Sequence, residues 1–257
     1  MCTVVILRRP DHPWPLILGA NRDEMRDRPW DRPGRHWTDR PDVVAGLDRL
    51  AGGSWLGLND SGVVATILNR TGSLGPDPDR RSRGELVLEA LDHADAGEAV
   101  RALSHLRADA YRSFNMLIAD DRDAWWLRSL GYGRVEAFEV PPGVSMLTSQ
   151  DLNDPRSPRI KGYKPRFEAA PAPDPEADDW FAWEALMAGR VFDTDAGPRG
   201  AMAIDTETGF GTVSSTLIAM PDRGQAAARP VWRFAAGMPG KSPYERLDLG
   251  AATSPAS

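Results

Sequence analysis

The stretch that decides the fold is Met1-Cys2-Thr3-Val4-Val5-Ile6-Leu7 together with Leu16-Ile17-Leu18-Gly19-Ala20-Asn21-Arg22-Asp23-Glu24. Thr3 to Leu7 and Leu16 to Ala20 are β-rich apolar runs, and Pro10-Asp11-His12-Pro13 between them is typical of a hairpin connection. In a hairpin the end of the second strand returns beside the start of the first. The pattern therefore predicts that the polar residues after Ala20 lie beside Cys2, at the solvent-facing end of a rigid strand.

Cys2 is the only cysteine of the chain, and removal of Met1 would make it the N-terminal residue. Its free α-amine would titrate near ~7.7–8.0, beside a thiol whose ordinary pKa is ~8.5. Such a residue carries both a nucleophile and a proton acceptor and needs no histidine. The alternative is that a small residue at position 2 has no function.

Composition limits the function classes. The chain has 257 residues, 41% of them hydrophobic, which is enough for a sizeable core. The net charge of −6 argues against a nucleic-acid binder, and one cysteine excludes an internal disulfide. No run approaches the ~20 apolar residues of a membrane span, and Thr3 to Leu7 is too short for a signal peptide. We expect a cytoplasmic protein.

Hydrophobic patterning predicts strands, then helices, then strands, then one helix and further strands. Ser82-Arg83-Gly84-Glu85 is a capping-box sequence before a helical stripe, and Asp95 is a candidate cap for a second helix. Trp180 to Ala188 indicates a later helix. The predicted strands after the hairpin are 43–47, 54–58, 63–68, 115–119, 124–128, 135–140, 144–148, 201–205, 212–220 and 231–235. This order favours an α+β fold with antiparallel sheets and helices packed outside them.

The domain organisation expected from this pattern is simple. Residues 1–238 form a single domain, and residues 239–257 form a polar C-terminal tail. The Pro-, Ala- and Asp-rich segment from Ala169 to Asp179 is predicted to be a surface loop within that domain.

Three polar residues at predicted strand ends are candidates for chemistry. Asp23 could accept a hydrogen bond from the α-ammonium group of Cys2, and Arg22 could hold the thiolate or a substrate carboxylate. The alternative for both is an ordinary charged turn. Asn69 could donate to a developing oxyanion, although a turn asparagine that bonds its own backbone is the commoner case.

Several motifs occur in a characteristic order. They are Met1-Cys2-Thr3, Gly19-Ala20-Asn21-Arg22-Asp23-Glu24, Gly52-Gly53-Ser54-Trp55-Leu56-Gly57, Asn69-Arg70, Arg83-Gly84-Glu85-Leu86-Val87 and Phe114-Asn115. In this order the chain resembles the NRDE family, also called the transport and Golgi organization protein 2 family. The resemblance implies an N-terminal-nucleophile hydrolase-like fold, a four-layer αββα sandwich of two antiparallel sheets. The resemblance also implies that penicillin V acylases and bile salt hydrolases are cysteine-dependent relatives of this family.

The resemblance also implies roles for particular residues. Cys2 matches the nucleophile, Asp23 the aspartate that contacts the N-terminal amine, and Asn69 the asparagine of the oxyanion hole. The chain departs from the acylase pattern on the substrate side. Ala20 and Val213 stand where arginines are expected, with Arg22 as a stand-in for the first, and Ser149 or Gln150 stands where an asparagine is expected.

The candidate catalytic residues are therefore Cys2, Asp23, Asn69 and Arg22, and the candidate substrate contacts are Asn21, Glu24, Ser149 and Trp55.

The expected activity is that of a cysteine N-terminal-nucleophile amidohydrolase, which cleaves the C–N bond of a small or lipid-like amide. The alternative is a non-catalytic protein that binds and traffics haem, lipid or acyl-CoA on the same scaffold. No cofactor is expected, with haem a ligand only under the alternative. No metal site is expected, because the four histidines show no metal-ligand spacing. The expected partner is a small molecule, and the oligomeric state is left open.

Overall fold

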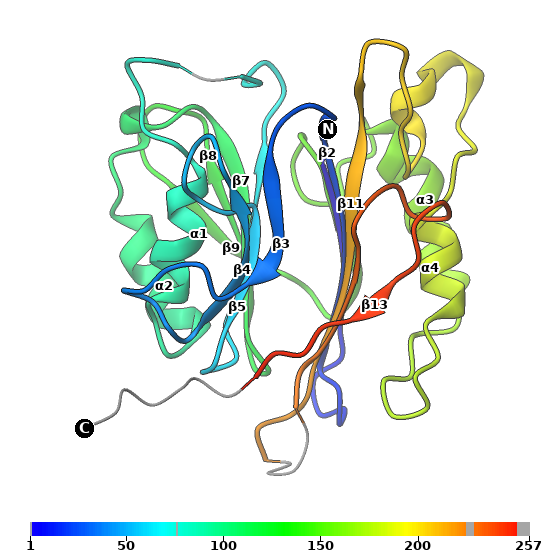
Figure 1. The fold of residues 1–257 in the computed structure, drawn as a ribbon, viewed down its shortest axis with the longest axis horizontal. Coiled ribbons are helices and arrows are strands. Elements are labelled where there is room, and N and C mark those ends of the chain that lie inside the picture. The colour runs from blue at the N-terminus through cyan, green and yellow to red at the C-terminus, as the bar shows by residue number, and fades with distance from the viewer. Residues whose placement is uncertain (1, 76, 225–228, 251–257) are drawn as a thin grey trace. The chain divides into compact units, whose positions relative to one another are not determined.

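The computed structural model describes residues 2–75, 77–224 and 229–250 (Figure 1). The chain divides into two compact units, each made of segments that are not contiguous in sequence. The first unit comprises Met1–Arg28, Leu68–Thr71 and Val140–Leu247. The second comprises Pro29–Ile67, Gly72–Glu139 and Asp248–Ser257. We describe each unit by itself.

The first unit is built on a six-stranded sheet in the order β10-β1-β2-β11-β12-β13, with every neighbouring pair antiparallel. Its strands are β1 (Thr3–Arg8), β2 (Leu16–Met25), β10 (Gly143–Leu147), β11 (Phe210–Met220), β12 (Val231–Ala235) and β13 (Glu245–Arg246). Helices α3 (Pro158–Ala169) and α4 (Phe181–Met187) cover one face of this sheet (Figure 1). Val5, Ile17 and Leu217 of the sheet share a buried core with Phe167 and Trp183 of the two helices.

The predicted hairpin is confirmed, and its second strand is longer than expected. β1 pairs with β2 in a register that places Thr3 opposite Asn21, and the connection contains Asp11 at a φ of 65°. β2 continues to Met25, so Asn21, Arg22 and Asp23 lie inside the strand and are buried. The prediction that these residues meet solvent at a strand end is wrong, because Phe210–Met220 pairs with β2 along that whole polar stretch.

The second unit contains a seven-stranded sheet in the order β3-β4-β5-β6-β7-β8-β9. Its strands are β3 (Trp30–Gly34), β4 (Val43–Asp48), β5 (Leu56–Asn59), β6 (Val64–Asn69), β7 (Phe114–Ala119), β8 (Ala124–Ser129) and β9 (Glu136–Glu139). The predicted turn between β5 and β6 is confirmed, with Gly62 at a φ of 79°. β3 was not predicted; its register shifts, and a proline lies inside it.

Helices α1 (Gly84–Leu91) and α2 (Ala96–Ser104) pack their apolar residues against the sheet of the second unit. Asp95 caps α2 as predicted, because its carboxylate accepts from the backbone N–H of Glu98 at 2.8 Å. The predicted capping box at α1 is wrong. Glu85 pairs with Arg81 at 2.7 Å, and the Ser82 hydroxyl accepts from the backbone N–H of Gly84 at 3.3 Å.

Two further differences concern the first unit. The pattern did not predict α3, which contains Gly162 and Pro165 and therefore lacks a strong helical signal. Residues 201–205 were predicted to be a strand, but they form bends with one isolated bridge from Asp205 to Gly211. The loop between α3 and α4 is confirmed. The described residues also form short 3₁₀ helices at Ala108–Ala110, Thr194–Ala196 and Pro198–Gly200.

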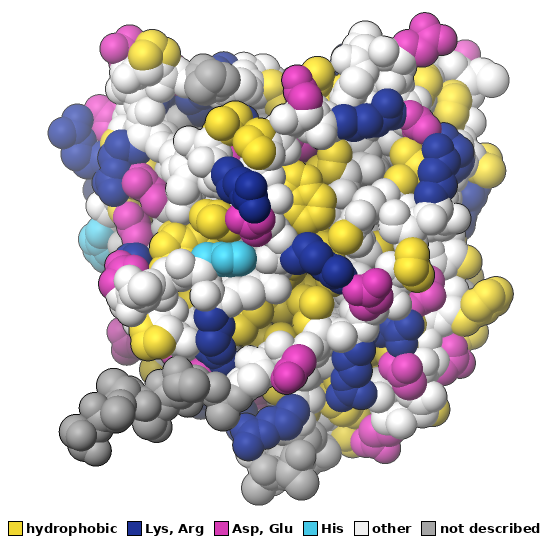
Figure 2. Space-filling model, in the orientation of Figure 1, with side chains coloured by type: hydrophobic (Ala, Val, Ile, Leu, Met, Phe, Trp, Pro, Cys, Tyr) yellow, Lys and Arg dark blue, Asp and Glu magenta, His cyan; other side chains and the backbone are white. Residues whose placement is uncertain are grey.

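The predicted α+β class and the two antiparallel sheets are confirmed. Residues up to Leu247 of the expected polar tail belong to the first unit, where β13 pairs with β12, and residues 251–257 lie outside the described residues. In the described part of the chain, none of the helices has both the length and the apolarity to cross a membrane. Figure 2 shows Lys and Arg side chains interspersed with Asp and Glu over the face in view.

Candidate active site

Cys2 lies one residue before β1, and the residue is partly exposed. The β1–β2 register brings the Asp23 end of β2 alongside the first residues of the chain. The Cys2 thiol donates a hydrogen bond to the backbone carbonyl of Asp23 over 3.6 Å. The predicted proximity of Cys2 to the Asn21-Arg22-Asp23 block is therefore confirmed.

Burial raises the pKa of the Cys2 thiol above its ordinary value, and the negative charge of Asp23 raises it further. The hydrogen bond to the Asp23 backbone and the charge of Arg22 act in the opposite direction. Although the residue is partly exposed, its sulfur is enclosed closely enough for burial to be the largest effect. A thiol with a raised pKa is protonated at neutral pH and needs a neighbouring base to become a thiolate.

The Asp23 carboxylate is held on both of its oxygens. Thr212 of β11 donates its hydroxyl to Oδ1 at 2.6 Å, and Arg159 of α3 donates Nη1 to Oδ2 at 3.1 Å. The Thr212 hydroxyl in turn accepts from the backbone N–H of Ile204 at 2.9 Å, which fixes its direction. The side chains of Asp23 and Arg159 are 0% and 3% exposed, so this is a fully buried ion pair.

Arg159 also donates to the hydroxyl of Thr3, which is the residue that follows Cys2. It lies in the first turn of α3, where Ser157 caps the helix and Pro158 begins it. A single guanidinium therefore links the helix to the head of β1 and to Asp23 of β2. Thr3, Arg159 and Thr212 were not identified from the sequence. The available signal was an arginine within a buried stripe that also contains Ile160, Tyr163 and Phe167.

Asn21 is 1% exposed, and all its side-chain polar atoms bond within the protein. Its amide donates to the backbone carbonyls of Met187 and Met202 at 2.9 and 3.0 Å. Its carbonyl oxygen accepts from the Ser215 hydroxyl at 2.5 Å. This arrangement ties β2 to the end of α4. The predicted contact of Asn21 with a substrate stays a prediction.

Arg22 and Glu24 alternate with Asn21 and Asp23 along β2. The side chains of Asn21 and Asp23 contact the face covered by the helices, and successive strand residues point to opposite faces. Arg22 therefore points to the other face, as does Cys2, which precedes Thr3 by one residue. Glu24 accepts from the backbone N–H of Met25 and lies 3.8 Å from Arg28, so its carboxylate has partners of its own.

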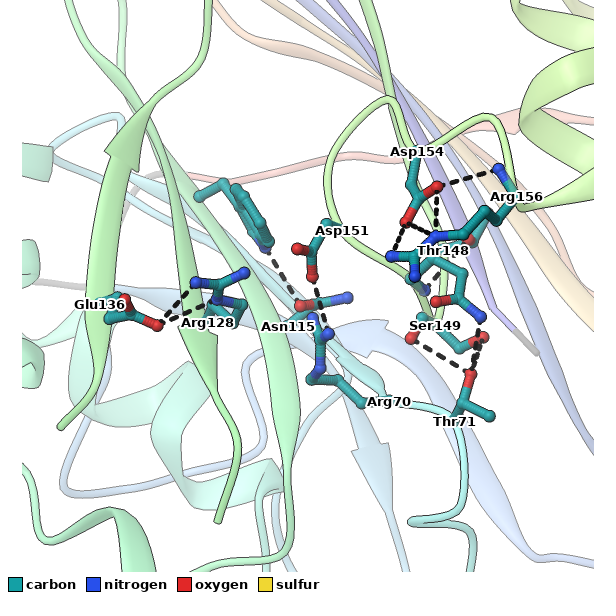
Figure 3. A network of polar contacts seen from close by, with 12 residues as sticks. Arg70, Thr71, Asn115, Arg128, Glu136, Thr148, Ser149, Asp151, Asp154 and Arg156 are labelled. Atoms are coloured by element: carbon teal, nitrogen blue, oxygen red, sulfur yellow. Dashed lines mark hydrogen bonds and ion pairs between the residues drawn. The ribbon is translucent and has the colours of Figure 1, made fainter. Parts of the chain in front are cut away.

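Asn69 ends β6 and is partly exposed. Its segment is fastened within the first unit, because Arg70 pairs with Asp151 at 2.7 Å and the backbone N–H of Thr71 donates to the Ser149 carbonyl at 3.2 Å (Figure 3). Among the described residues, nothing accepts a hydrogen bond from the Asn69 side-chain amide. That amide is thus available to a bound molecule, as its predicted role requires.

Ser149 is 3% exposed, and its hydroxyl accepts from Thr71 at 3.2 Å (Figure 3). Gln150, the other residue considered at this position, donates its side-chain amide to the Thr71 hydroxyl at 3.2 Å. Both polar groups therefore hold the 68–71 segment in place. Their predicted contact with a substrate stays a prediction.

Trp55 belongs to the second unit, whereas the other candidate residues belong to the first. Its ring packs directly against Gly46, where a Cβ would lie only 2.3 Å from the indole. It also contacts Trp30 edge-on, with ring centroids 5.8 Å apart. Within the second unit Trp55 is a packing residue, and its predicted substrate contact stays a prediction.

No metal centre is visible in the described ranges, where no three His, Cys, Asp or Glu side chains gather closely enough to hold an ion.

The two antiparallel sheets with their helices form an N-terminal-nucleophile hydrolase-like fold. Solved structures show the same fold. A penicillin V acylase from Agrobacterium tumefaciens matches with a TM-score of 0.51 and 14% identity, over 91% of this chain and 83% of that one. An N-acylethanolamine-hydrolyzing acid amidase orthologue from Caenorhabditis elegans matches with a TM-score of 0.53 and 14% identity, over 84% of this chain and 92% of that one.

A variant of the conjugated bile acid hydrolase from Clostridium perfringens matches with a TM-score of 0.53 and 11% identity over the whole of both chains. At these identities the likeness concerns the fold alone.

The chain belongs to the Transport and Golgi organisation 2 family, whose family model matches residues 1–228. The mouse Transport and Golgi organization 2 homolog is 37% identical over 114 residues, which is 41% of this chain and 38% of that protein. The human homolog is 35% identical over 111 residues, again 41% of this chain and 38% of the relative. The similarity thus spans little more than a third of the curated relatives' length.

Proposed function

We propose that this chain is a cysteine N-terminal-nucleophile amidohydrolase that acts on a small or lipid-like amide. The observation that carries the proposal is the contact of the Cys2 thiol with the Asp23 backbone, beside an Asp23 carboxylate held by Arg159 and Thr212. A fold shared with an acylase, an amidase and a bile acid hydrolase supports this class of reaction.

In the proposed mechanism, removal of Met1 exposes the α-amine of Cys2, which accepts the thiol proton. The thiolate attacks the amide carbonyl, and the Asn69 amide with a backbone N–H stabilises the oxyanion. Collapse of the tetrahedral intermediate releases the amine, which takes the proton from the α-ammonium. Water then attacks the thioester, and the acid leaves as the thiol is restored.

Asp23 fixes the α-amine, and its own orientation comes from Arg159 and Thr212. These two are positioning residues, because they act on the reacting atoms through Asp23. Arg22 points to the same face of the sheet as Cys2, where its charge favours the thiolate and can orient a substrate carboxylate. Asn21 has no part in this mechanism beyond holding α4 to β2.

The test uses protein of known intact mass and a series of N-acyl aminocoumarins that differ in acyl length. Protein that has lost Met1 should release the coumarin, and Cys2→Ala should abolish this release. Asn69→Ala should reduce kcat at least about a hundredfold, since one oxyanion donor contributes roughly 3 kcal/mol. Lys161→Ala, an exposed lysine of α3 outside the mechanism, is the control and should retain turnover. Unchanged turnover in Cys2→Ala would refute the proposal.

The second candidate function is binding without catalysis, with haem, lipid or acyl-CoA as cargo. The observation that favours it is the presence of two apolar residues, Ala20 and Val213, where the family resemblance implies substrate-binding arginines. Both residues are 8% exposed. Retention of Met1 together with co-purifying haem or lipid in the intact-mass experiment would support this function over hydrolysis.

A further inference from the structure

A cavity lies on the helix side of the first unit, and Cys2 is not among its lining residues. It has a volume of about 580 Å³ and lies between α4, β12 and the segment 240–244 that leads into β13. Figure 1 shows α4 beside that segment. This volume falls within the ~300–1,000 Å³ of small-molecule sites. Cys2 points to the opposite face of the sheet, so this cavity is distinct from the candidate active site.

One wall of the cavity is apolar. Phe181 of α4 lines it and is 80% exposed, an unusual exposure for a phenyl ring. Ala185, Ala188 and Pro243 continue the apolar surface. A ligand with a short hydrocarbon or aromatic body would cover Phe181 and remove this area from water.

One lining residue of the cavity, Lys241, belongs to a cluster with an excess of positive charge. Lys241 lines the cavity, and its Nζ lies 3.1 Å from Oδ2 of Asp205. Arg190 reaches the same oxygen at 3.3 Å, and Arg26 bonds the other oxygen. Three cations thus share one carboxylate, and all three are more than half exposed. An anion can reach them without disturbing the core.

The other cation of the cavity is already neutralised. Arg233 pairs with Asp178 at 2.8 Å and with Glu184 at 3.2 Å, so carboxylates outnumber the guanidinium there. An incoming anion would be repelled at the Arg233 end and attracted at the Lys241 end. The charge distribution therefore favours an anionic ligand whose charged group lies at the Lys241 end of the cavity.

We propose that this cavity binds a small amphiphilic anion, with its carboxylate or phosphate group at Lys241 and Arg190 and its short apolar body against Phe181. The cavity also contacts the core of the sheet. Tyr244 lines it, and the Tyr244 hydroxyl lies 2.5 Å from that of Ser215, which donates to Asn21 of β2. A ligand that contacts Tyr244 would therefore be linked through Ser215 to Asn21, which precedes Asp23 by two residues in β2.

The experiment is calorimetric titration of the full chain with four probes: phenyl phosphate, phenylacetate, benzyl alcohol and inorganic phosphate. The two amphiphilic anions should bind with a Kd of about 1 mM or tighter. Benzyl alcohol and inorganic phosphate each lack one of the two recognised parts and should bind at least about tenfold more weakly. A preference between phenyl phosphate and phenylacetate distinguishes phosphate from carboxylate as the natural headgroup.

Variants locate the site. Lys241→Ala and Phe181→Ala should each weaken phenyl phosphate binding at least about fivefold, and added salt should weaken wild-type binding while leaving Lys241→Ala little changed. Lys161→Ala, an exposed lysine of α3 outside the cavity, should bind as wild type does. Cys2→Ala should also bind normally, which separates this cavity from the active site. Equal binding by Lys241→Ala and Lys161→Ala, or equal binding of all four probes, would overturn the proposal.

Discussion

Two charges of opposite sign act on the Cys2 thiol from adjacent positions of one strand. Asp23 raises the pKa of the thiol, and Arg22 lowers it. Because side chains alternate along β2, Asp23 acts from the helix face and Arg22 from the face to which Cys2 points. One strand thus supplies both the carboxylate that raises the pKa of the thiol and the cation that lowers it.

The first prediction concerns the pH dependence of Cys2 alkylation by iodoacetamide. Removal of the negative charge in Asp23→Asn should lower the pKa of the thiol, so the midpoint of the alkylation rate should move to lower pH. Removal of the positive charge in Arg22→Gln should move it to higher pH. Lys161→Ala should leave the midpoint unchanged. Shifts of the same sign in both charge variants would contradict this electrostatic account.

The buried Asp23–Arg159 pair leads to a second prediction. Removing one partner leaves the other charge buried without compensation, so Arg159→Met should lower the free energy of unfolding by about 3–5 kcal/mol. In urea denaturation the double variant Asp23→Asn with Arg159→Met should lose less than the sum of the single variants. Arg101→Ala provides the control, because its pair with Glu98 is 68% and 56% exposed and should cost under about 1 kcal/mol. Additive losses would show that the buried pair is not coupled.

The part of the site that could be predicted from sequence is the part that is local. The hairpin pattern sufficed to bring Cys2 and Asp23 together, since their proximity depends only on a short turn. Arg159 and Thr212 reach Asp23 from 136 and 189 residues away in the chain, through packing that no local pattern encodes. The sequence shows that Asn21 is polar, but it does not show the buried bonds of its amide to the backbone carbonyls of Met187 and Met202.

At the scale of elements, β2 and α3 show why sequence patterns mislead. β2 continues through four polar residues because β11 pairs along them and α3 supplies Arg159, so burial of a polar stretch is made possible by other elements. α3 forms despite Gly162 and Pro165 because Ile160, Tyr163 and Phe167 pack onto the sheet. Tertiary packing outweighs local propensity in both elements.

The third prediction tests the intrinsic weakness of α3. Gly162 is exposed within the helix, and a Cβ built there meets nothing within 4 Å, so Gly162→Ala should raise the free energy of unfolding by about 0.5–1 kcal/mol. Gly133 is an equally open position but has a φ of +71°, so Gly133→Ala should be destabilising. Thermal denaturation of both variants measures the contrast. A stabilised Gly133→Ala, or a destabilised Gly162→Ala, would contradict this explanation.

At the scale of the whole molecule, the chain passes between its two units five times, after Arg28, Ile67, Thr71, Glu139 and Leu247. The largest continuous piece of the first unit, Val140–Leu247, contains β10, β11, β12 and β13. In the sheet order, β1 and β2 lie between β10 and β11. That piece therefore lacks the centre of its own sheet.

The fourth prediction follows from this topology. A fragment of residues 140–250 should show no cooperative unfolding transition in urea by circular dichroism, because β11 would lose β2 as a partner and the helices would have no complete sheet to cover. Mixing it with a fragment of residues 1–139 should restore a cooperative transition if the missing hairpin is the cause. The same mixture made with Val5→Asp and Ile17→Asp in the first fragment is the control and should not recover, because both side chains are fully buried against the helices. Cooperative unfolding of the isolated 140–250 fragment would contradict this prediction, because it would show that the β1–β2 hairpin is dispensable for folding of the first unit.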